Sequence, residues 1–471
     1  MKLALFKVLS EPEVEEIHQV TLHLLENPGI RVSDAPLRQM MAEAGCHVKG
    51  NSENVRFPAA LVTELLQGVP ASFEVRGLEE DETVRIGGGR MCAASGFMGC
   101  FMFEPSRRDR RPLTLRDVGQ FVRLAEKLDT IDLQAVPGQP NDLDQGVGLA
   151  AAVQEMLLYT RKPLIIAPFA ESDVKLIQAL LSTLGGHAGA PSRWICQQSM
   201  RSPLTLPPDM AQVMRTVIPL GVPMNFHTAP QTAASAPFTL AGLIAQYNTE
   251  MVCALVSSQI IKKGAPCIYG GGWGTSDLQK LQRHLGSPEA ALLRIAGAQM
   301  ARFYGVPSHG IGPDTDAQSV DPRNGWEKML SCLALVGAGT DLIINAGMFG
   351  TAMNMSLSQL VIDHEIIGAA RRCSQGLLVD RERLAEEVIR EAGPDCSFLG
   401  HEHTLKHMRD GEFWIPTVSR TETFPEWLER GGPSTALDSE LRAQELLAGE
   451  VIPVISEEAQ RALQSVLGSK K

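Results

Sequence analysis

The stretch KPLIIAPFA (162–170) shows the pattern that decides the fold: an apolar run of strand length ends in proline, aromatic and small residues, and a helix-forming segment follows. An uninterrupted apolar run suits a strand that is buried on both faces. Strands that alternate with helices predict right-handed crossovers and a parallel sheet. The same pattern recurs in TIDLQAVPGQP (130–140), RWICQQSM (193–200), PMNFHTAP (223–230), PCIYGGGWG (266–274), VPSHGIGPD (306–314) and DLIINAGMFG (341–350).

Seven such units in a chain of 471 residues predict an α/β fold of the (β/α)8 TIM-barrel type. The eighth strand is expected either in RCSQGLLVD (372–380) or in the region before residue 130. An open, doubly wound sheet is the alternative, but such a sheet normally has fewer strands and a phosphate-binding loop. We therefore place the barrel at 129–380, between an N-terminal extension (1–128) and a C-terminal helical region packed on the barrel (381–471).

The N-terminal extension is expected to combine helices with a small antiparallel sheet. Capping signals predict helices after Ser10, Asp34 and Thr114, and another helix follows Pro58. Between these helices the chain becomes strand-like around glutamate, aspartate and glycine turns. The strand-like runs are ASFEVRGL (71–78), ETVRIGG (82–88) and CFMFEP (100–105).

Composition excludes several classes of protein. The chain has 43 lysines and arginines against 54 aspartates and glutamates, a formal net charge of −11, so nucleic acid is not an expected partner. No uncharged apolar run reaches the roughly 18 residues of a membrane-spanning helix. The nine cysteines form no CxxC pair, which is typical of reduced cysteines in a cytoplasmic protein.

The strand ends supply the candidate site, because ligands bind at the carboxyl ends of barrel strands. Aromatic residues sit in or just after these strands, and their faces can surround a quaternary ammonium group. They are Phe169, Phe226, Tyr269, Trp273 and Phe349. Packing in the core is the alternative for each ring. Asp314 and Asp316 are candidates for acid–base work, although GPDTD (312–316) is also good turn chemistry.

A metal site is considered and set aside. His403 and His407 are four residues apart, as zinc ligands on a helix often are, and His401 lies close by. The glutamate of this segment is misplaced for an HExxH motif, and no cysteine or carboxylate has suitable spacing nearby. We therefore predict no metal ligands, with a structural or interface role for these histidines; a zinc enzyme on the same barrel is the alternative.

Several stretches, in this order, resemble the trimethylamine methyltransferase family of corrinoid-dependent enzymes. They span nearly the whole chain, and the HEHT segment is specific to this family. The resemblance implies a (β/α)8 barrel and transfer of a methyl group from a methylamine-type substrate to the cobalt of a separate corrinoid protein. The stretches are ENPGIRV (26–32), RRPLTLRDVGQFVRLAEKL (110–128), TAPQTAASAPFTLAGLIAQYNTE (228–250), GSPEAALLRIAGAQMARFYGVP (286–307) and FLGHEHTLKHMR (398–409).

One departure from the family bears on the substrate. Trimethylamine-using members carry pyrrolysine in a glycine-rich loop, whereas this chain reads GIGPDTDAQSVD (310–321) and has Asp314 at about that place. The chain therefore resembles the non-pyrrolysine branch, whose members demethylate quaternary amines such as glycine betaine. The expected reaction converts glycine betaine to dimethylglycine; proline betaine or carnitine as substrate, or a betaine-binding barrel without catalysis, are the alternatives.

The expected site follows from this chemistry. A quaternary ammonium loses a methyl group to Co(I) without proton transfer, so orientation and desolvation matter more than an acid or a base. Asp314 is the candidate catalytic residue and faces the cation. We expect no tightly bound cofactor, a corrinoid protein as partner, and a homo-oligomer. The candidate substrate-binding residues are Tyr269, Trp273 and Phe349 for the ammonium, and Gln198, Asn225, His227 and His309 for the carboxylate.

Overall fold

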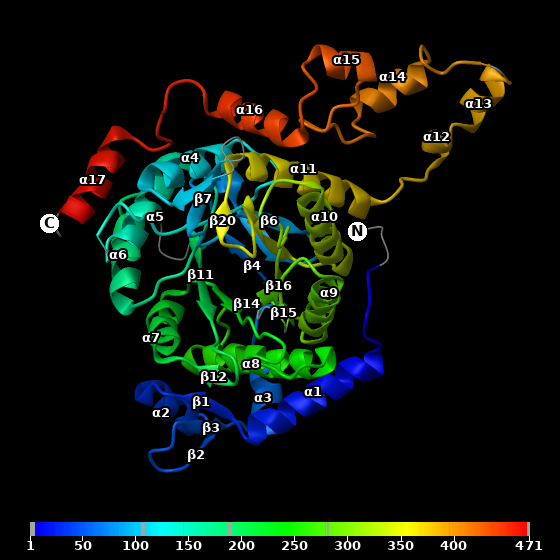
Figure 1. Cartoon of the computed structure of the whole chain (residues 1–471). Helices are drawn as coiled ribbons and strands as arrows, with labels where there is room; N and C mark the ends of the chain where they lie inside the picture. The colour runs from blue at the N-terminus through cyan, green and yellow to red at the C-terminus, as the bar shows by residue number, and fades with distance from the viewer. Residues whose placement is uncertain are drawn as a thin grey trace.

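Each of the seven predicted runs contributes a strand to one parallel sheet in the computed structural model, which describes residues 5–104, 109–144, 146–185, 191–277, 279, 282–394 and 396–468. The sheet has eight strands and is surrounded by helices (Figure 1). The predicted (β/α)8 barrel is confirmed. In sheet order the strands are β6 (Cys92–Ser95), β18 (Leu342–Ala346), β17 (Ser308–Ile311), β14 (Cys267–Gly271), β13 (Met224–His227), β11 (Trp194–Ser199), β10 (Leu164–Ile166) and β9 (Gln134–Ala135).

The eighth strand is β6, which comes first in the sequence. It pairs in parallel with β18, and a bridge between Ala94 and Leu133 joins its other edge to the segment that enters β9. The Ser95 backbone N–H donates to the Leu133 carbonyl at 3.3 Å. Of the two alternatives for this strand, the region before residue 130 is right and 372–380 is wrong, because that segment completes a helix and then continues without strand structure.

Eight helices follow the eight strands and form the outer layer (Figure 1). The helix α8 is buried along most of its length, because the N-terminal helices α1 (Glu11–Glu26) and α3 (Ala59–Leu66) pack on its outer side. The barrel helices are α4 (Leu115–Glu126), α5 (Gly148–Tyr159), α6 (Glu171–Ser182), α7 (Pro208–Val217), α8 (Leu240–Ile261), α9 (Pro288–Phe303), α10 (Pro322–Ala338) and α11 (Leu357–Gln375).

The helices of the N-terminal extension begin at the predicted caps. Asp34 caps α2 (Ala35–Glu43) by accepting a hydrogen bond from the Leu37 N–H, and Thr114 caps α4 in the same way. The extension also forms a small mixed sheet with a strand from the β11–α7 connection. Its order is β12 (Thr205–Leu206), β1 (Ile30–Val32), β3 (Asn54–Arg56) and β2 (His47–Val48).

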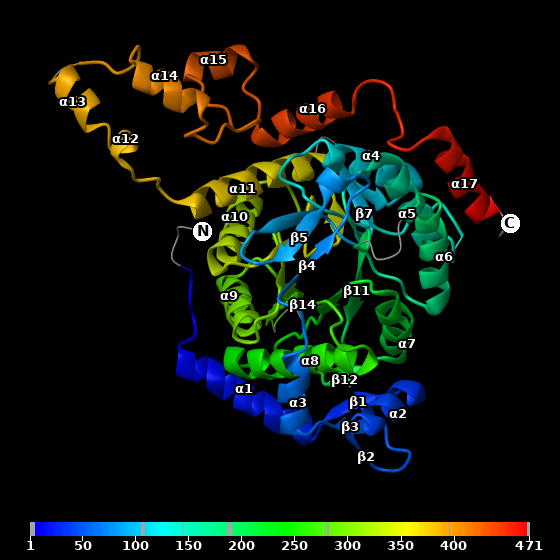
Figure 2. The ribbon, with the colours of Figure 1, turned by 180° about the vertical axis from the view of Figure 1, so that it is seen from behind.

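The strand-like runs between 71 and 105 lie at opposite ends of the barrel. The first two form an antiparallel hairpin, β4 (Ser72–Val75) and β5 (Val84–Gly87), whose Val75 and Ile86 are fully buried against the barrel interior. This hairpin covers the amino end of the barrel (Figure 2). The third run does not join it: β7 (Phe101–Glu104) pairs with β8 (Asp109–Pro112) and with β20 (Asn354–Met355).

The C-terminal region divides into a packed part and an arm. The helix α16 (Thr435–Leu447) packs on α11 and α4, and α17 (Glu457–Gly468) contacts α5 and α6. Both views show α12 to α15 as an arm that extends away from the barrel (Figures 1 and 2). No helix among the described residues is long and apolar enough to cross a membrane. The arm helices are α12 (Arg381–Leu384), α13 (Glu386–Ala392), α14 (Glu402–Arg409) and α15 (Phe424–Glu429).

The packing of Trp273 against α9 gives a test of the fold. A Cβ atom at Gly297 would lie 2.3 Å from Cζ2 of Trp273, whereas one at Gly325 of α10 would meet no atom within 4 Å. Gly297→Ala is therefore expected to lower the free energy of unfolding by roughly 1–3 kcal/mol through overpacking. Gly325→Ala should raise it by up to about 1 kcal/mol through helix propensity. Urea unfolding of both variants checks this, and equal effects would contradict it.

Candidate active site

A cavity of about 400 Å³ lies at the carboxyl ends of the barrel strands. Its walls come from six strands or their following loops and from the start of α7, so it occupies the place where barrel enzymes bind ligands. The lining residues are Phe97, Met98, Ala167, Pro168, Phe169, Gln197, Gln198, Ser199, Asp209, Met210, His227, His309, Ile311, Ile344, Asn345 and Ala352.

The predicted carboxylate donors are brought together here. Gln198, His227 and His309 line the cavity, and Asn225 lies buried beside it, where its Nδ2 donates to Oε1 of Gln197 at 3.0 Å. The rings of His227 and His309 lie 6.1 Å apart between their centroids. Several polar atoms of this group have no hydrogen-bond partner among the described residues: Oδ1 of Asn225, Nδ1 of His227, and both ring nitrogens of His309. Such buried atoms are costly unless a ligand or water pairs with them.

Glycines of β14 and its following loop make room for these side chains. A Cβ at Gly270 would lie 2.2 Å from Nδ1 of His309, and one at Gly272 would lie 2.9 Å from Cε1 of His227. The glycine-rich stretch 269–274 therefore lets two imidazoles cross the barrel mouth. In the sequence the same glycines suggest room at a strand end, and the structure shows which side chains use it.

The three predicted aromatic residues lie away from the cavity. Tyr269 points to the helix layer, where its hydroxyl donates to Oδ1 of Asn248 at 2.7 Å. Trp273 packs between α8 and α9, 4.5 Å from the ring of Tyr247 between centroids. Phe349, in β19 (Met348–Phe349), stacks edge to face on Phe103 at 5.1 Å. These rings contribute to packing in the structure, the alternative given for each of them.

The alternation of a strand explains the difference. Successive side chains point to opposite faces, so residues two apart share the barrel interior. Ile268 is packed in the interior cluster, and the His309 side chain of β17 lies against Gly270 on the same face. Tyr269, between Ile268 and Gly270, faces the helices. The same parity places Asn225 and His227 together on β13. Parity was available from the sequence and would have separated Tyr269 from the donors.

Two lining residues were missed because the strand that precedes them was not predicted as part of the barrel. Phe97 and Met98 follow β6, which was assigned to the N-terminal extension. Asp209, at the start of α7, was also missed, whereas Phe169, at the end of β10, is one of the strand-end aromatic residues noted from the sequence, and it does line the cavity. The signal for Phe97 is the run CAASGFMG (92–99), a short strand followed by glycine and an aromatic residue, which repeats the pattern of the other seven units with smaller side chains.

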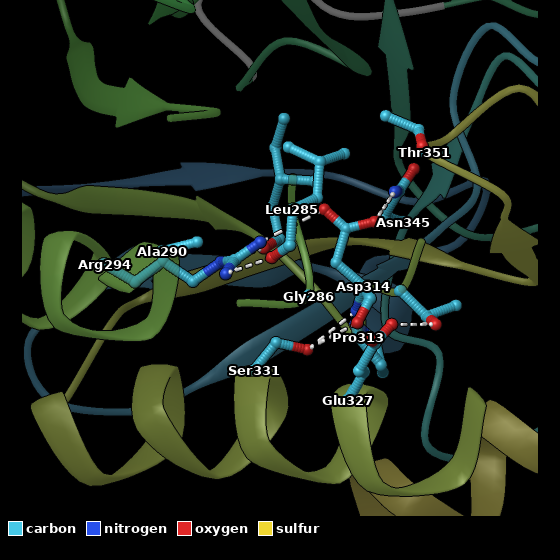
Figure 3. Close-up of polar contacts among 12 residues, drawn as sticks. Leu285, Gly286, Ala290, Arg294, Pro313, Asp314, Glu327, Ser331, Asn345 and Thr351 are labelled. Carbon is cyan, nitrogen blue, oxygen red and sulfur yellow. Dashed lines mark hydrogen bonds and ion pairs between the residues drawn. The ribbon is translucent and has the colours of Figure 1, made fainter. Parts of the chain in front are cut away.

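Asp314 lies behind the cavity wall in a buried polar network (Figure 3). One carboxylate oxygen accepts from Nη2 of Arg294 at 3.2 Å, and the other accepts from Nδ2 of Asn345 at 3.2 Å. Burial raises the pKa of Asp314, and the charges of Arg294 and Lys328 oppose that rise. Asp314 therefore reaches the cavity only through Asn345, a lining residue whose backbone has the unusual φ of 133°.

The imidazoles of the cavity are held neutral. Burial, together with the positive charge of Arg283, lowers the pKa of His227 to about 4. Burial likewise lowers the pKa of His309 well below its ordinary value. At neutral pH each ring therefore offers one N–H donor and one lone pair.

The histidines predicted to be structural lie on the C-terminal arm. His401 caps α14 through its Nδ1, which accepts from the His403 N–H at 3.1 Å. The rings of His403 and His407 lie 4.3 Å apart, and Nε2 of His407 is 3.8 Å from Oε1 of Glu382. No group of three or more potential metal ligands converges in the part of the chain that the structure describes. The prediction of no metal ligands stays a prediction.

Barrel, cavity and donor set define a small-molecule enzyme site at the mouth of a TIM barrel. A family model described as trimethylamine methyltransferase (MTTB) matches residues 1–471. The chain therefore belongs to the trimethylamine methyltransferase family, and the resemblance inferred from the sequence is confirmed. By class it is a methylamine-type methyltransferase.

Curated relatives match almost end to end. A trimethylamine methyltransferase MttB2 of Methanosarcina mazei is 30% identical over 481 residues, which cover 99% of this chain and 95% of the relative. A glycine betaine methyltransferase of Desulfitobacterium hafniense is 28% identical over 473 residues, with 99% and 97% covered. The monomethylamine methyltransferase MtmB of Methanosarcina barkeri has a similar fold, with a TM-score of 0.50, 9% identity, and 97% and 91% of the two chains covered.

The ion pair of Asp314 gives a test of its role. Asp314→Asn removes the anion beside the buried Arg294, and an unpaired buried charge typically costs about 3–5 kcal/mol. The variant is expected to lose that much free energy of unfolding in a denaturant titration. Asp81→Asn, at an exposed position, should change it by less than about 0.5 kcal/mol. Full stability of Asp314→Asn would show that Arg294 does not need this anion.

The pKa of His227 predicts a dependence of stability on pH. Its folded value of about 4 lies below the unfolded value of about 6.5, so the unfolded chain alone takes up this proton as the pH falls from 7 to 5. His227 should therefore account for about 2 kcal/mol of lost stability over that interval. His227→Gln should show a loss smaller by that amount, and His47→Gln, at an exposed position, the loss of the unaltered protein. Identical losses for His227→Gln and the unaltered protein would contradict the assignment.

Proposed function

We propose that the protein transfers a methyl group from a quaternary amine, with glycine betaine as the first choice, to the Co(I) of a corrinoid carried by a separate protein. The product would be dimethylglycine. The family is a methyltransferase family, and one of its curated relatives is a glycine betaine methyltransferase. The presence of Asp314, an ordinary residue, in the glycine-rich loop supports a quaternary amine over trimethylamine.

The observation that carries this proposal is the polarity of the cavity. One side, formed by β10 and the start of α7, presents the ring of Phe169 and the carboxylate of Asp209. The other side, formed by β13 and β17, presents the neutral imidazoles of His227 and His309. An aromatic face and an anion attract a quaternary ammonium, and N–H donors bind a carboxylate. A betaine carries these two groups at its two ends.

The site residues are assigned on this basis. Phe169, Phe97 and Asp209 surround the ammonium in place of Tyr269, Trp273 and Phe349, whose side chains lie away from the cavity. The carboxylate is bound by donors among Gln198, Asn225, His227 and His309. Asp314 acts as a positioning residue, because it holds the amide of Asn345 at the cavity wall and its own charge is paired with Arg294.

The reaction then needs no acid or base. The lone pair of Co(I) forms the new Co–C bond while the N–CH3 bond breaks, and the electron pair of that bond remains on nitrogen as a neutral tertiary amine. Cobalt is formally oxidised from Co(I) to Co(III), and no proton moves. The protein contributes orientation of the methyl group toward the barrel mouth and exclusion of water from the cation. Neutral histidines suit this task because they add no positive charge beside the ammonium.

The remaining proposals concern partners and location. The corrinoid arrives on its own protein at the barrel mouth, so this chain needs no tightly bound cofactor. All nine cysteines are free, which supports a reducing, cytoplasmic setting. The arm carries exposed apolar side chains such as Leu399, Phe413 and Ile415, which favour a homo-oligomer.

The test uses the full-length chain with chemically reduced cob(I)alamin and a panel of glycine betaine, proline betaine, carnitine and trimethylamine. We expect methylcobalamin to form, seen in its absorption spectrum, with glycine betaine as the best donor. A bulkier betaine as the best donor would keep the reaction and change the substrate. Methyl transfer from trimethylamine alone would contradict the proposal, and saturable betaine binding without transfer, even with corrinoid proteins added, would make the protein a binder.

Two variants sharpen the assay. His309→Leu removes both unpaired ring nitrogens from the cavity and is expected to lower kcat/KM for glycine betaine by about tenfold or more. Tyr269→Phe removes only the hydrogen bond to Asn248 outside the barrel and should leave kcat/KM within about twofold. Equal effects of the two substitutions would argue against a cavity role for His309.

A further inference from the structure

A half-buried arginine, Arg283, lies near the donor side of the cavity. Arg283 belongs to β16 (Gln282–His284), which pairs with β15 (Thr275–Asp277) in a hairpin that follows β14. Ser276, the partner of Arg283 in this register, donates its hydroxyl to the carbonyl of Thr232 and so fixes the hairpin above the end of β13. The side chain of Arg283 crosses Gly274, where a Cβ would lie 2.5 Å from its Nε. A side chain at position 274 would therefore force Arg283 to move.

The guanidinium group of Arg283 has the charges of Asp314 and Asp316 nearby, but no carboxylate is hydrogen-bonded to its Nε or Nη2 in the described part of the chain. Its Nε and Nη2 are buried and have no hydrogen-bond partner there. The two nearby carboxylates are engaged elsewhere. Asp314 accepts from Arg294 and Asn345, and Asp316 accepts from the N–H groups of Leu285 and Gly286. Buried N–H donors without an acceptor are unfavourable, so the Nε and Nη2 groups of Arg283 would gain hydrogen bonds from an added anion.

The position of Arg283 indicates that the anion belongs to the ligand of the cavity. Its charge acts on His227, a residue of the cavity wall, and lowers the pKa of that imidazole. The geometry agrees: Arg283 lies against Gly274, two residues beyond Gly272, against which His227 lies, so Arg283 is on the His227 side of the cavity. Arg294 pairs with Asp314 at 3.2 Å, which leaves the guanidinium group of Arg283 available to a substrate carboxylate.

We propose that Arg283, with His227, forms a carboxylate-binding subsite that selects quaternary amines bearing a carboxylate over amines that lack one. This inference rests on the proposed function and adds to it the residue that sets substrate class. Trimethylamine and choline have no carboxylate and cannot use the subsite. Glycine betaine places its carboxylate at Arg283 and its ammonium toward Phe169 and Asp209.

The test separates the two ends of the substrate by equilibrium binding to the full chain, without corrinoid. The probes are glycine betaine, 3,3-dimethylbutanoate, which keeps the carboxylate but replaces nitrogen by carbon, and tetramethylammonium, which keeps only the cation. Arg283→Gln is expected to raise the Kd of both carboxylate probes by about ten- to a hundredfold and to change the Kd of tetramethylammonium by no more than about twofold. Arg283→Lys keeps the charge, so its affinity for the carboxylate probes should lie between those of the unaltered protein and Arg283→Gln. It replaces the glutamine variant if that variant does not fold.

Arg193 provides the matched control. Its Nε and Nη1 are likewise buried and have no partner among the described residues, but it stands at the amino end of β11, away from the cavity. Arg193→Gln should leave the affinities of all three probes unchanged. Equal weakening of all probes by Arg283→Gln, or wild-type affinity for both carboxylates, would overturn the subsite.

The outcomes distinguish this inference from the proposed function. Methyl transfer from glycine betaine that Arg283→Gln does not impair, in KM or in kcat, would leave the function standing and remove the subsite. Binding of 3,3-dimethylbutanoate that depends on Arg283, in a protein that transfers a methyl group from no quaternary amine, would leave the subsite standing and remove the function.

Discussion

Closure of the barrel by β6 is the contact on which the rest of the molecule depends. This four-residue strand pairs with β18 on one side and meets the entry to β9 on the other. A closed sheet leaves no free edge, and its eight carboxyl ends then converge on one mouth. The loop after β6 supplies Phe97 and Met98 to the cavity, so the same strand that completes the barrel also completes the site.

The sequence predicts most of this architecture because seven strands are built from large apolar residues and end in unusual polar ones. β6 consists of Cys92, Ala93, Ala94 and Ser95, which carry little strand propensity, and two further strands separate it from its helix α4. Its small side chains fit a crowded place in the barrel, where Ala94 meets Leu133. Their burial depends on partners more than 200 residues away, such as Leu342, which no local pattern reveals.

The candidate site could be predicted only in part, because the sequence locates strand ends more readily than it gives the direction of each side chain. Being at a strand end brings His227 and His309 to the mouth, but only the direction of each side chain decides whether it faces the cavity. Trp273 lies beyond the end of its strand, where alternation no longer holds, and its direction is set by the groove that Gly297 leaves in α9. The position of Arg283 is still harder to predict from the sequence, because it depends on how the hairpin after β14 folds back over β13.

The hairpin of β4 and β5 at the amino end has a consequence for the order of events. Val75 and Ile86 pack against the barrel interior at that end, so among the described residues the carboxyl side is the open entrance to the cavity. In the proposed reaction the methyl acceptor docks at the same opening. The amine must then enter first, and the demethylated product must wait until the acceptor has departed. Kinetics of this kind are compulsory-ordered, and an excess of the acceptor protein would slow turnover by covering the entrance before the amine arrives.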